Sequence, residues 1–273
     1  MRGLGGGGPT LALMWWLVGF PAAAAAQVAP NRATSYLHPT DVRDARALWV
    51  NPAELGVSRE ASVHLDLTVG EPGARGRVQQ VTAGFNSRGL SFGYQRDVFD
   101  GGGRGHTYRV GLAGSSGAGR LAGGVAGALY RGQTSSTGWD LGLVYAGRVL
   151  AAGGVIANIG QPVVRGFRQR VTYVPGATLH PFGPQAALSW HGRITSTAVM
   201  SYSFGLRWSW AARLPLEVTA RLDTDRGLRR GAFAFAISLG RLNRLGIVAT
   251  TPGDVSTVEA ASVYGVATSP MTR

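Results

Sequence analysis

Apolar and polar side chains alternate along most of this chain, beginning near residue 61. The pattern is clearest in residues 199–210, where every second side chain is large and apolar. A period of two places the two sets on opposite faces of a β-strand, and it cannot form one face of a helix. The apolar set in this segment is Met200, Tyr202, Phe204, Leu206, Trp208 and Trp210. The sequence therefore predicts an all-β fold.

The alternating segments are long and numerous. We count about fourteen, each of roughly eight to twelve residues and separated by turn signals rich in glycine, proline and serine. Strands of soluble proteins are most often about five or six residues long, whereas tilted strands that cross a bilayer need about nine to eleven. The segments lie at or near 61–70, 78–87, 90–96, 106–114, 120–131, 138–147, 149–159, 174–182, 185–193, 199–210, 214–223, 231–240, 243–251 and 255–267.

Charged residues fall on the polar side of these segments. A membrane barrel needs an apolar exterior and a wet lumen, so this division predicts a transmembrane, up-and-down antiparallel barrel of about fourteen strands. If residues 211–213 form a hairpin turn, Trp210 faces Leu214 and Arg207 lies opposite Glu217, which predicts an ion pair in the lumen. The lumen-facing candidates are Asp66, Arg109, Asp140, Arg207, Glu217 and Arg221.

The first residues resemble a secretory signal peptide. Arg2 precedes an apolar run at residues 11–20, which is followed by the small residues 21–26. The apolar run has about ten residues, where a membrane-spanning helix needs roughly 20. We expect residues 1–26 to be a cleavable signal peptide, residues 27–60 an N-terminal plug, and residues 61–273 the barrel.

Composition argues against several classes of function. The formal net charge is +13, but the 27 basic residues are all arginines and are scattered singly, apart from the pair Arg229-Arg230, so no run tracks a phosphate backbone. We therefore expect no nucleic-acid partner. The chain has no cysteine, and its five histidines lack the spacing of a zinc site, so we expect no metal and no cofactor.

Two motifs imitate enzyme signatures without their context. Residues 89–93, GLSFG, match a nucleophile elbow around Ser91, but that elbow needs a strand, a sharp turn and a helix, whereas Ser91 falls within an alternating strand. Residues 117–122, GAGRLA, imitate a dinucleotide-binding turn, yet the helix that should follow would contain several glycines. We predict that the protein is not an enzyme.

A different pattern precedes the strands. Residues 45–56, ARALWVNPAELG, begin like an amphipathic helix and then meet Asn51-Pro52. The residue before proline is pushed out of the helical region, and proline lacks an amide donor. This predicts two short apolar turns on either side of a break, with the Asn51 side chain bonding to nearby backbone.

These motifs resemble FadL-type outer-membrane barrels and their PorV-like relatives. The resemblance rests on ALWVNPAEL at residues 47–55 and on DLGLVYAGRVLAAGGVIANIG at residues 140–160, with its short motif at 157–160, and it extends over essentially the mature chain. In that family the first element belongs to an N-terminal hatch inside the barrel. The resemblance therefore implies that Trp49, Asn51, Pro52 and Leu55 form a plug or gate.

The resemblance also implies function and location. It leads us to expect an outer-membrane protein of a diderm bacterium, in contact with membrane lipid, that passively transports hydrophobic small molecules through a plugged lumen. The alternative is a PorV-like scaffold that transports nothing and serves a secretion or surface-attachment system through a periplasmic or secreted protein partner. The short turns between most segments favour this second function.

Overall fold

The computed structural model describes residues 31–58, 60–70, 78–99, 103–116, 120–132, 135–164, 167–210, 213–228, 231–251 and 258–269. The signal peptide expected at residues 1–26 lies outside these ranges.

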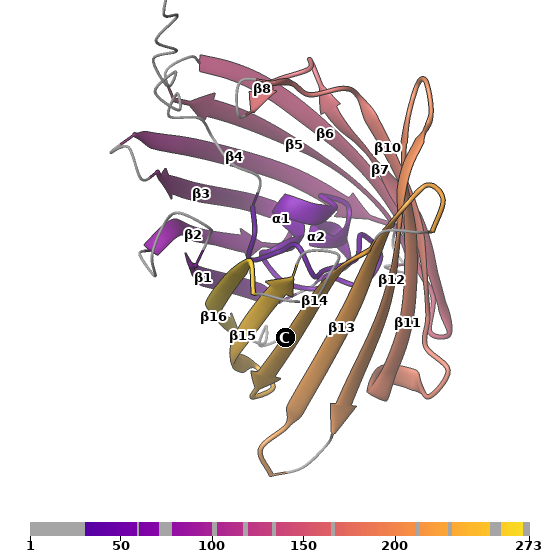
Figure 1. The fold of residues 1–273 in the computed structure, drawn as a ribbon. Helices are drawn as coiled ribbons and strands as arrows, with labels where there is room; N and C mark the ends of the chain where they lie inside the picture. The colour runs from indigo at the N-terminus through magenta and orange to yellow at the C-terminus, as the bar shows by residue number, and fades with distance from the viewer. Residues whose placement is uncertain are drawn as a thin grey trace, which may run out of the picture.

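The described chain is almost entirely β-structure, with two one-turn helices ahead of the first strand (Figure 1). The helices are α1 (Ala47–Val50), α2 (Glu54–Val57) and the 3-10 helix η1 (Gly183–Gln185). The barrel strands are β1 (Ala61–Val69), β2 (Val78–Ser87), β3 (Leu90–Val98), β4 (Arg104–Ser115), β5 (Leu121–Arg131), β6 (Ser135–Ala146), β7 (Leu150–Ile159), β10 (Thr172–Leu179), β11 (Ala186–Thr195), β12 (Val199–Trp210), β13 (Leu216–Asp225), β14 (Gly231–Leu239), β15 (Asn243–Thr251) and β16 (Ala260–Ser269). The pair β8 (Val163–Val164) and β9 (Phe167–Arg168) forms a separate two-stranded hairpin.

These strands close into a ring. Each of the fourteen pairs antiparallel with its neighbours, and β1 pairs with β16 from Ala61↔Ser269 to Val69↔Ala261. Closure leaves no strand edge without a partner, which is the condition for β-structure in a bilayer. The predicted all-β, up-and-down transmembrane barrel of about fourteen strands is confirmed.

No helix in the described ranges is long and apolar enough to cross a membrane.

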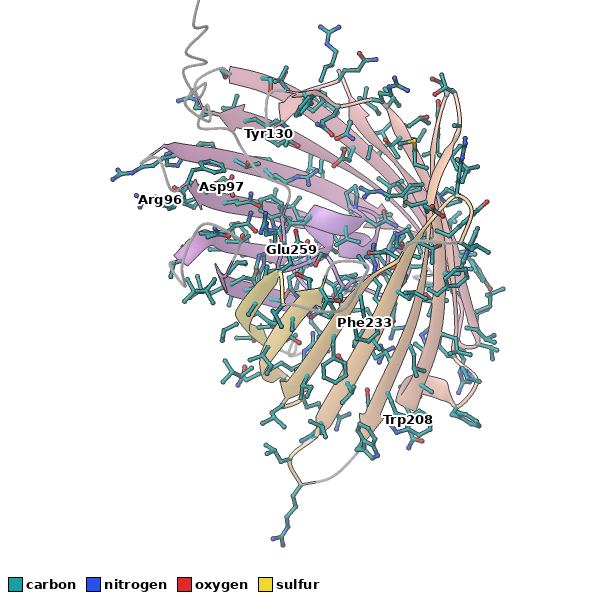
Figure 2. The ribbon with its side chains drawn as sticks, viewed as in Figure 1. Arg96, Asp97, Tyr130, Trp208, Phe233 and Glu259 are labelled. Atoms are coloured by element: carbon teal, nitrogen blue, oxygen red, sulfur yellow. The ribbon has the colours of Figure 1, made fainter. Side chains whose placement is uncertain are left out.

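The two faces of the wall differ in polarity as predicted. In β1, Val63 and Leu65 point outward and are each 53% exposed, whereas His64 and Asp66 point inward and are 3% and 1% exposed. A water-soluble protein buries the opposite set. Figure 2 shows side chains on both faces of the wall, with Trp208 near the lower end of β12. The apolar exterior is therefore a lipid-facing surface.

The two ends of the barrel differ in their connections. At one end, the short-turn rim, the strands are joined by residues 88–89, 116–120, 147–149, 180–185, 211–215 and 240–242. At the other end, the long-loop rim, the connection from β7 to β10 spans residues 160–171 and contains β8 and β9 (Figure 1). Outer-membrane barrels place short turns on the periplasmic side and long loops outside.

One predicted register was wrong. Trp210 pairs with Leu216, not Leu214, so Arg207 lies opposite Thr219 and Ser209 lies opposite Glu217. The shift is two residues, which keeps every side chain on its predicted face. Arg207 and Glu217 still form an ion pair at 3.4 Å, but they do so diagonally.

The lipid-facing assignment can be tested at Leu65, in the middle of β1. Replacing Leu65 by arginine should destabilise the barrel in vesicles by about 2–4 kcal/mol, because the charge is placed at the bilayer midplane. Leu65→Arg would have little effect if that face were exposed to water. The control is Leu228→Arg in the loop after β13, where Leu228 is 61% exposed and the cost should be about 0–1 kcal/mol. Urea unfolding of both variants in lipid measures the difference.

Candidate functional site in the barrel lumen

Residues 31–58, here called the internal segment, lie inside the ring of strands (Figure 1). Near the middle of β2 and β3, the side-chain amide of Asn31 donates to Thr82 Oγ1 at 3.0 Å and to Gln95 Oε1 at 3.1 Å. Near the short-turn rim, Asp41 pairs with Arg207 of β12. The segment therefore runs through the lumen before it joins β1.

The break at Asn51-Pro52 has the form that the sequence predicts. Helix α1 ends at Val50, and α2 begins at Glu54. Asn51 Oδ1 accepts a bond from the Ala53 amide at 3.0 Å, and Asn51 Nδ2 donates to the Pro39 carbonyl at 2.6 Å. Asn51 is fully buried. Its side chain thus joins three parts of the internal segment and satisfies an amide that the proline leaves without a helical partner.

Apolar side chains of the two helices pack against β3, β4 and β5. Leu48 and Leu55 are fully buried and meet the wall near Gly111 and Ala126. Trp49 is only partly buried. Leu55 is one of the residues that the family resemblance implies for the plug, whereas Leu48, seven residues earlier, was not predicted from the sequence. Burying two leucines contributes about 1.5–3 kcal/mol each.

Glycines bring the backbone of the internal segment against the wall. A Cβ atom at Gly124 of β5 would overlap the Pro52 carbonyl, and one at Gly142 of β6 would overlap the Asn51 side chain. A Cβ atom at Gly56 would lie 2.9 Å from the Gly114 carbonyl oxygen. Larger side chains at these positions would push the Asn51-Pro52 break away from the wall.

Four residues from four elements form the first polar cluster. Arg109 of β4 forms an ion pair with Asp140 of β6, and its guanidinium carbon lies 5.4 Å from the centroid of the Trp49 ring. Asp140 Oδ1 accepts the backbone amide of Asn158 at 2.9 Å. Asn158 has a φ of 63°, an unusual conformation for a residue other than glycine. The cluster joins the two sequence motifs on which the family resemblance rests.

A second polar cluster links the internal segment to the strands near the short-turn rim. Arg207 contacts Asp41 at 2.8 Å and Glu217 at 3.4 Å. Arg244 contacts Asp44 at 2.6 Å and Glu217 at 3.6 Å. The sequence analysis predicted Arg207 and Glu217 as lumen residues but did not find Asp41, Asp44 or Arg244, because their partners are distant in sequence.

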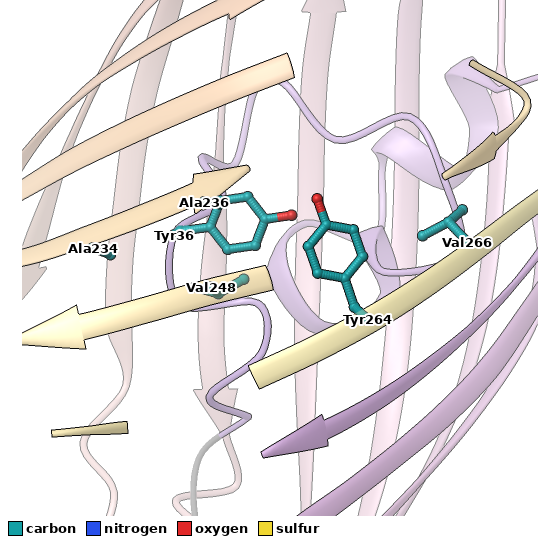
Figure 3. Packing of buried hydrophobic residues seen from close by; sticks show 6 residues of the cluster. All are labelled: Tyr36, Ala234, Ala236, Val248, Tyr264 and Val266. Carbon is teal, nitrogen blue, oxygen red and sulfur yellow. The ribbon is translucent and has the colours of Figure 1, made fainter. Parts of the chain in front are cut away.

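Arg46 is the buried centre of this second cluster. It binds Asp44 at 2.8 Å, donates to the Tyr36 hydroxyl at 2.5 Å, and lies 4.6 Å from the Tyr264 ring centroid. Figure 3 shows the hydroxyl groups of Tyr36 and Tyr264 turned toward each other. Burial opposes ionisation of Asp44, but Arg46 and Arg244 hold its pKa well below the usual range. The ion pair therefore stays charged at physiological pH.

The remaining lumen candidates also point inward. Arg221 donates to the Leu37 carbonyl at 2.8 Å and to Asp223 at 2.8 Å, so it holds the internal segment to β13. Asp66 is buried and lies 3.4 Å from His64 on the same strand. Ser91 lies within β3 and donates to the Phe85 carbonyl at 2.9 Å, which is a strand position and not a nucleophile elbow.

A cavity of about 500 Å³ lies between the internal segment and the short-turn rim. The apolar side chains on its lining include Leu37, Val42 and Val57, all from the internal segment. Polar lining includes Arg207 and Glu217 of the second cluster. The cavity therefore offers a small molecule an apolar side formed by the internal segment and a charged side that includes Asp41, Arg207 and Arg244.

Glu54 is a buried carboxyl group on the first turn of α2. Burial raises its pKa to about 8, and the nearby charge of Asp41 acts in the same direction. The group is therefore protonated at neutral pH while the internal segment is in place. In the described ranges, no group of three or more histidine, aspartate or glutamate side chains could hold a metal ion.

Comparison with solved structures shows which known barrels share this fold. No protein-family model matches the sequence, and no curated protein matches it. Among solved structures, the CymD monoaromatic hydrocarbon channel superposes with a TM-score of 0.60 at 11% identity, covering 89% of this chain and 97% of that one. A FadL homologue from Pseudomonas aeruginosa matches at 10% identity and a TM-score of 0.49, covering 90% and 99% of the two chains. The resemblance to FadL-type barrels is confirmed at the level of the fold, whereas a PorV-like relationship is not shown.

The first polar cluster can be tested by a double-mutant cycle. Arg109→Met and Asp140→Asn should each destabilise the barrel, because each leaves a buried charge without its partner. The double variant should lose less than the sum of the two, with a coupling energy of about 0.5–3 kcal/mol. Arg104→Met paired with Asp140→Asn serves as the control and should be additive, since Arg104 is exposed at the start of the same strand. Additivity of the Arg109 and Asp140 variants would contradict the ion pair.

Glu54 predicts a pH dependence of the internal segment. Its folded pKa of about 8 lies above the ordinary value of 4.5, so the docked state binds the extra proton. Docking is most favourable below pH 4.5 and weakens as the pH rises through about 8. Leakage of small solutes from vesicles should therefore rise between pH 5 and pH 9. Glu54→Gln should abolish the rise, whereas Glu60→Gln, at an exposed position, should retain it. An unchanged pH profile in Glu54→Gln would exclude this role.

Proposed function

We propose that this protein is an outer-membrane channel for small hydrophobic molecules, with the internal segment as its plug and gate. The observation that carries the proposal is a lumen occupied by a segment that noncovalent contacts hold against the wall before the chain continues into β1. An open porin needs a continuous aqueous lumen. Here Leu48, Leu55 and the Asn51-Pro52 break pack directly against the strands.

The contacts of the internal segment are suited to a movable gate. Hydrogen bonds from Asn31 hold it at mid-strand, and ion pairs of Asp41 and Asp44 hold it near the short-turn rim. Such contacts can be exchanged for water when the segment shifts, whereas the strand ladders outside it are not disturbed. Beside these contacts, the cavity at the short-turn rim offers the apolar side chains of Leu37, Val42 and Val57.

The fold supports the same class of substrate. CymD, whose barrel this chain resembles, is described as a channel for monoaromatic hydrocarbons. A cavity of about 500 Å³ suits a ligand of that size or somewhat larger. The ligand for this chain is therefore proposed to be a small hydrophobic compound, and the expected location is the outer membrane of a diderm bacterium.

The alternative is a scaffold that transports nothing and binds a periplasmic or secreted protein. The dense ion pairing between the internal segment and the short-turn rim favours it, because a permanently fixed plug needs no room to move. Transport and scaffold functions differ in one measurable way, since only the channel changes the rate at which a hydrophobic compound enters cells.

Uptake and gating can be tested together. Cells that express the chain should take up labelled toluene or a labelled fatty acid faster than cells without it, while uptake of a labelled sugar should be unchanged. The variants Arg207→Gln with Arg244→Gln, and Asn51→Ala with Pro52→Ala, should raise the leakage of small solutes from vesicles, because each loosens the internal segment.

The matched control for these variants is Arg168→Gln with Arg226→Gln, which removes two exposed arginines at the long-loop rim. Heat-modifiable migration in gels verifies that every variant is folded. Equal uptake with and without the chain, together with a co-purifying periplasmic protein, would favour the scaffold. Unaltered leakage in both lumen variants would show that the internal segment is not a gate.

A further inference from the structure

A repeated pair of residues marks the short-turn rim. Five of its six turns carry an arginine that is followed within two residues by a large apolar residue. The sixth turn, between β10 and β11, carries Phe182 next to η1. The pairs are Arg88 with Leu90, Arg120 with Leu121, Arg148 with Val149, Arg213 with Leu214, and Arg241 with Leu242. We call these residues, with Phe182, the arginine–apolar ring.

Both members of each pair are open to the surroundings. The five arginines are exposed, and Val149, Leu214 and Phe182 are 61%, 60% and 65% exposed. Within the described ranges, Arg120, Arg213 and Arg241 form no ion pair, unlike the lumen arginines of the two polar clusters. Their charges therefore remain available to an anion outside the protein.

The ring lies where a membrane interface is expected. Trp208 and Trp210, at the end of β12, form an aromatic group with Phe182. The ring centroids of Phe182 and Trp208 are 6.0 Å apart, and those of Trp208 and Trp210 are 6.2 Å apart. Tryptophan collects at the level of lipid headgroups. Arginine can extend its charged end to the headgroup region while its stem and an adjoining apolar side chain stay in the acyl region.

We propose that the arginine–apolar ring binds the headgroups of anionic phospholipids in the leaflet that faces the short-turn rim. The arginines contact the lipid phosphates, and the adjoining leucine, valine and phenylalanine side chains enter the upper acyl region. The distribution of the pairs favours lipid over a protein partner. Five of the six hairpins around the circumference contribute one, which matches a surrounding membrane plane, whereas a protein would meet a patch on one side.

The proposal predicts that anionic lipid is enriched over zwitterionic lipid beside the ring. Quenching of tryptophan fluorescence by brominated lipid measures this preference locally. With Trp139 and Trp190 replaced by phenylalanine, Trp208 and Trp210 are the lipid-facing reporters beside the ring. The barrel is reconstituted in phosphatidylcholine that contains brominated phosphatidylglycerol or brominated phosphatidylcholine. Phosphatidylglycerol should be preferred by about fivefold for a lipid that contacts one arginine at low salt. Arg120→Gln, Arg213→Gln and Arg241→Gln together should bring this preference close to one.

The control removes the same charge from the long-loop rim, through Arg104→Gln, Arg168→Gln and Arg226→Gln, all at exposed positions. This control variant should keep the preference seen at Trp208 and Trp210. Glycerol phosphate in solution should not reduce it either, which separates a lipid headgroup from free phosphate. If the variant with all three ring arginines replaced fails to fold, Arg213→Gln alone, on the turn next to Trp210, should still lower the preference for phosphatidylglycerol.

Two results would overturn the proposal. One is a preference for phosphatidylglycerol that persists in a folded barrel without Arg120, Arg213 and Arg241. That result would favour a protein partner for these arginines. The other is an equal loss of preference in the ring and control variants, which would reflect net charge and not a site.

Discussion

The hydrocarbon core of a bilayer offers no hydrogen-bond partner to a peptide group, and the pairing of β1 with β16 is the contact that removes this difficulty. Once these two strands close the ring, every ladder is complete and the outer face can carry only apolar side chains. The cost of this arrangement is a wall most of whose polar side chains point into the lumen. The rest of the structure depends on how those inward groups are satisfied.

The internal segment satisfies many of them. Arg207, Arg221 and Arg244 of the strands are paired with Asp41, the Leu37 carbonyl and Asp44. Arg46 and Tyr36 complete the group from the segment itself. A buried ion pair is a weak source of stability, but removing one partner is costly, so such pairs specify a position strongly. The segment is therefore placed by complementary charge at its ends and by the packing of Leu48 and Leu55 in the middle.

The Asn51-Pro52 break shows how a local rule and a tertiary contact combine. Proline ends α1 and frees Asn51 to bond both Ala53 and Pro39. Gly124 and Gly142 then let this tight turn approach β5 and β6 at backbone distance. These two glycines thus serve the fit of the segment, and Trp49 beside Arg109 links that fit to the Asn158 bend of β7.

The sequence alone determined the strand count, the face of nearly every side chain and the position of the break, because these depend on a period of two and on the local chemistry of Asn-Pro. It also placed Arg109, Asp140, Arg207, Glu217, Arg221 and Asp66 on the inner face. Only the tertiary structure decided which of them meet. The diagonal contact of Arg207 with Glu217 required the true hairpin register, and the pairing of Asp44 with Arg244 joins residues 200 positions apart. Such contacts depend on how the internal segment crosses a closed ring, and no local pattern carries that information.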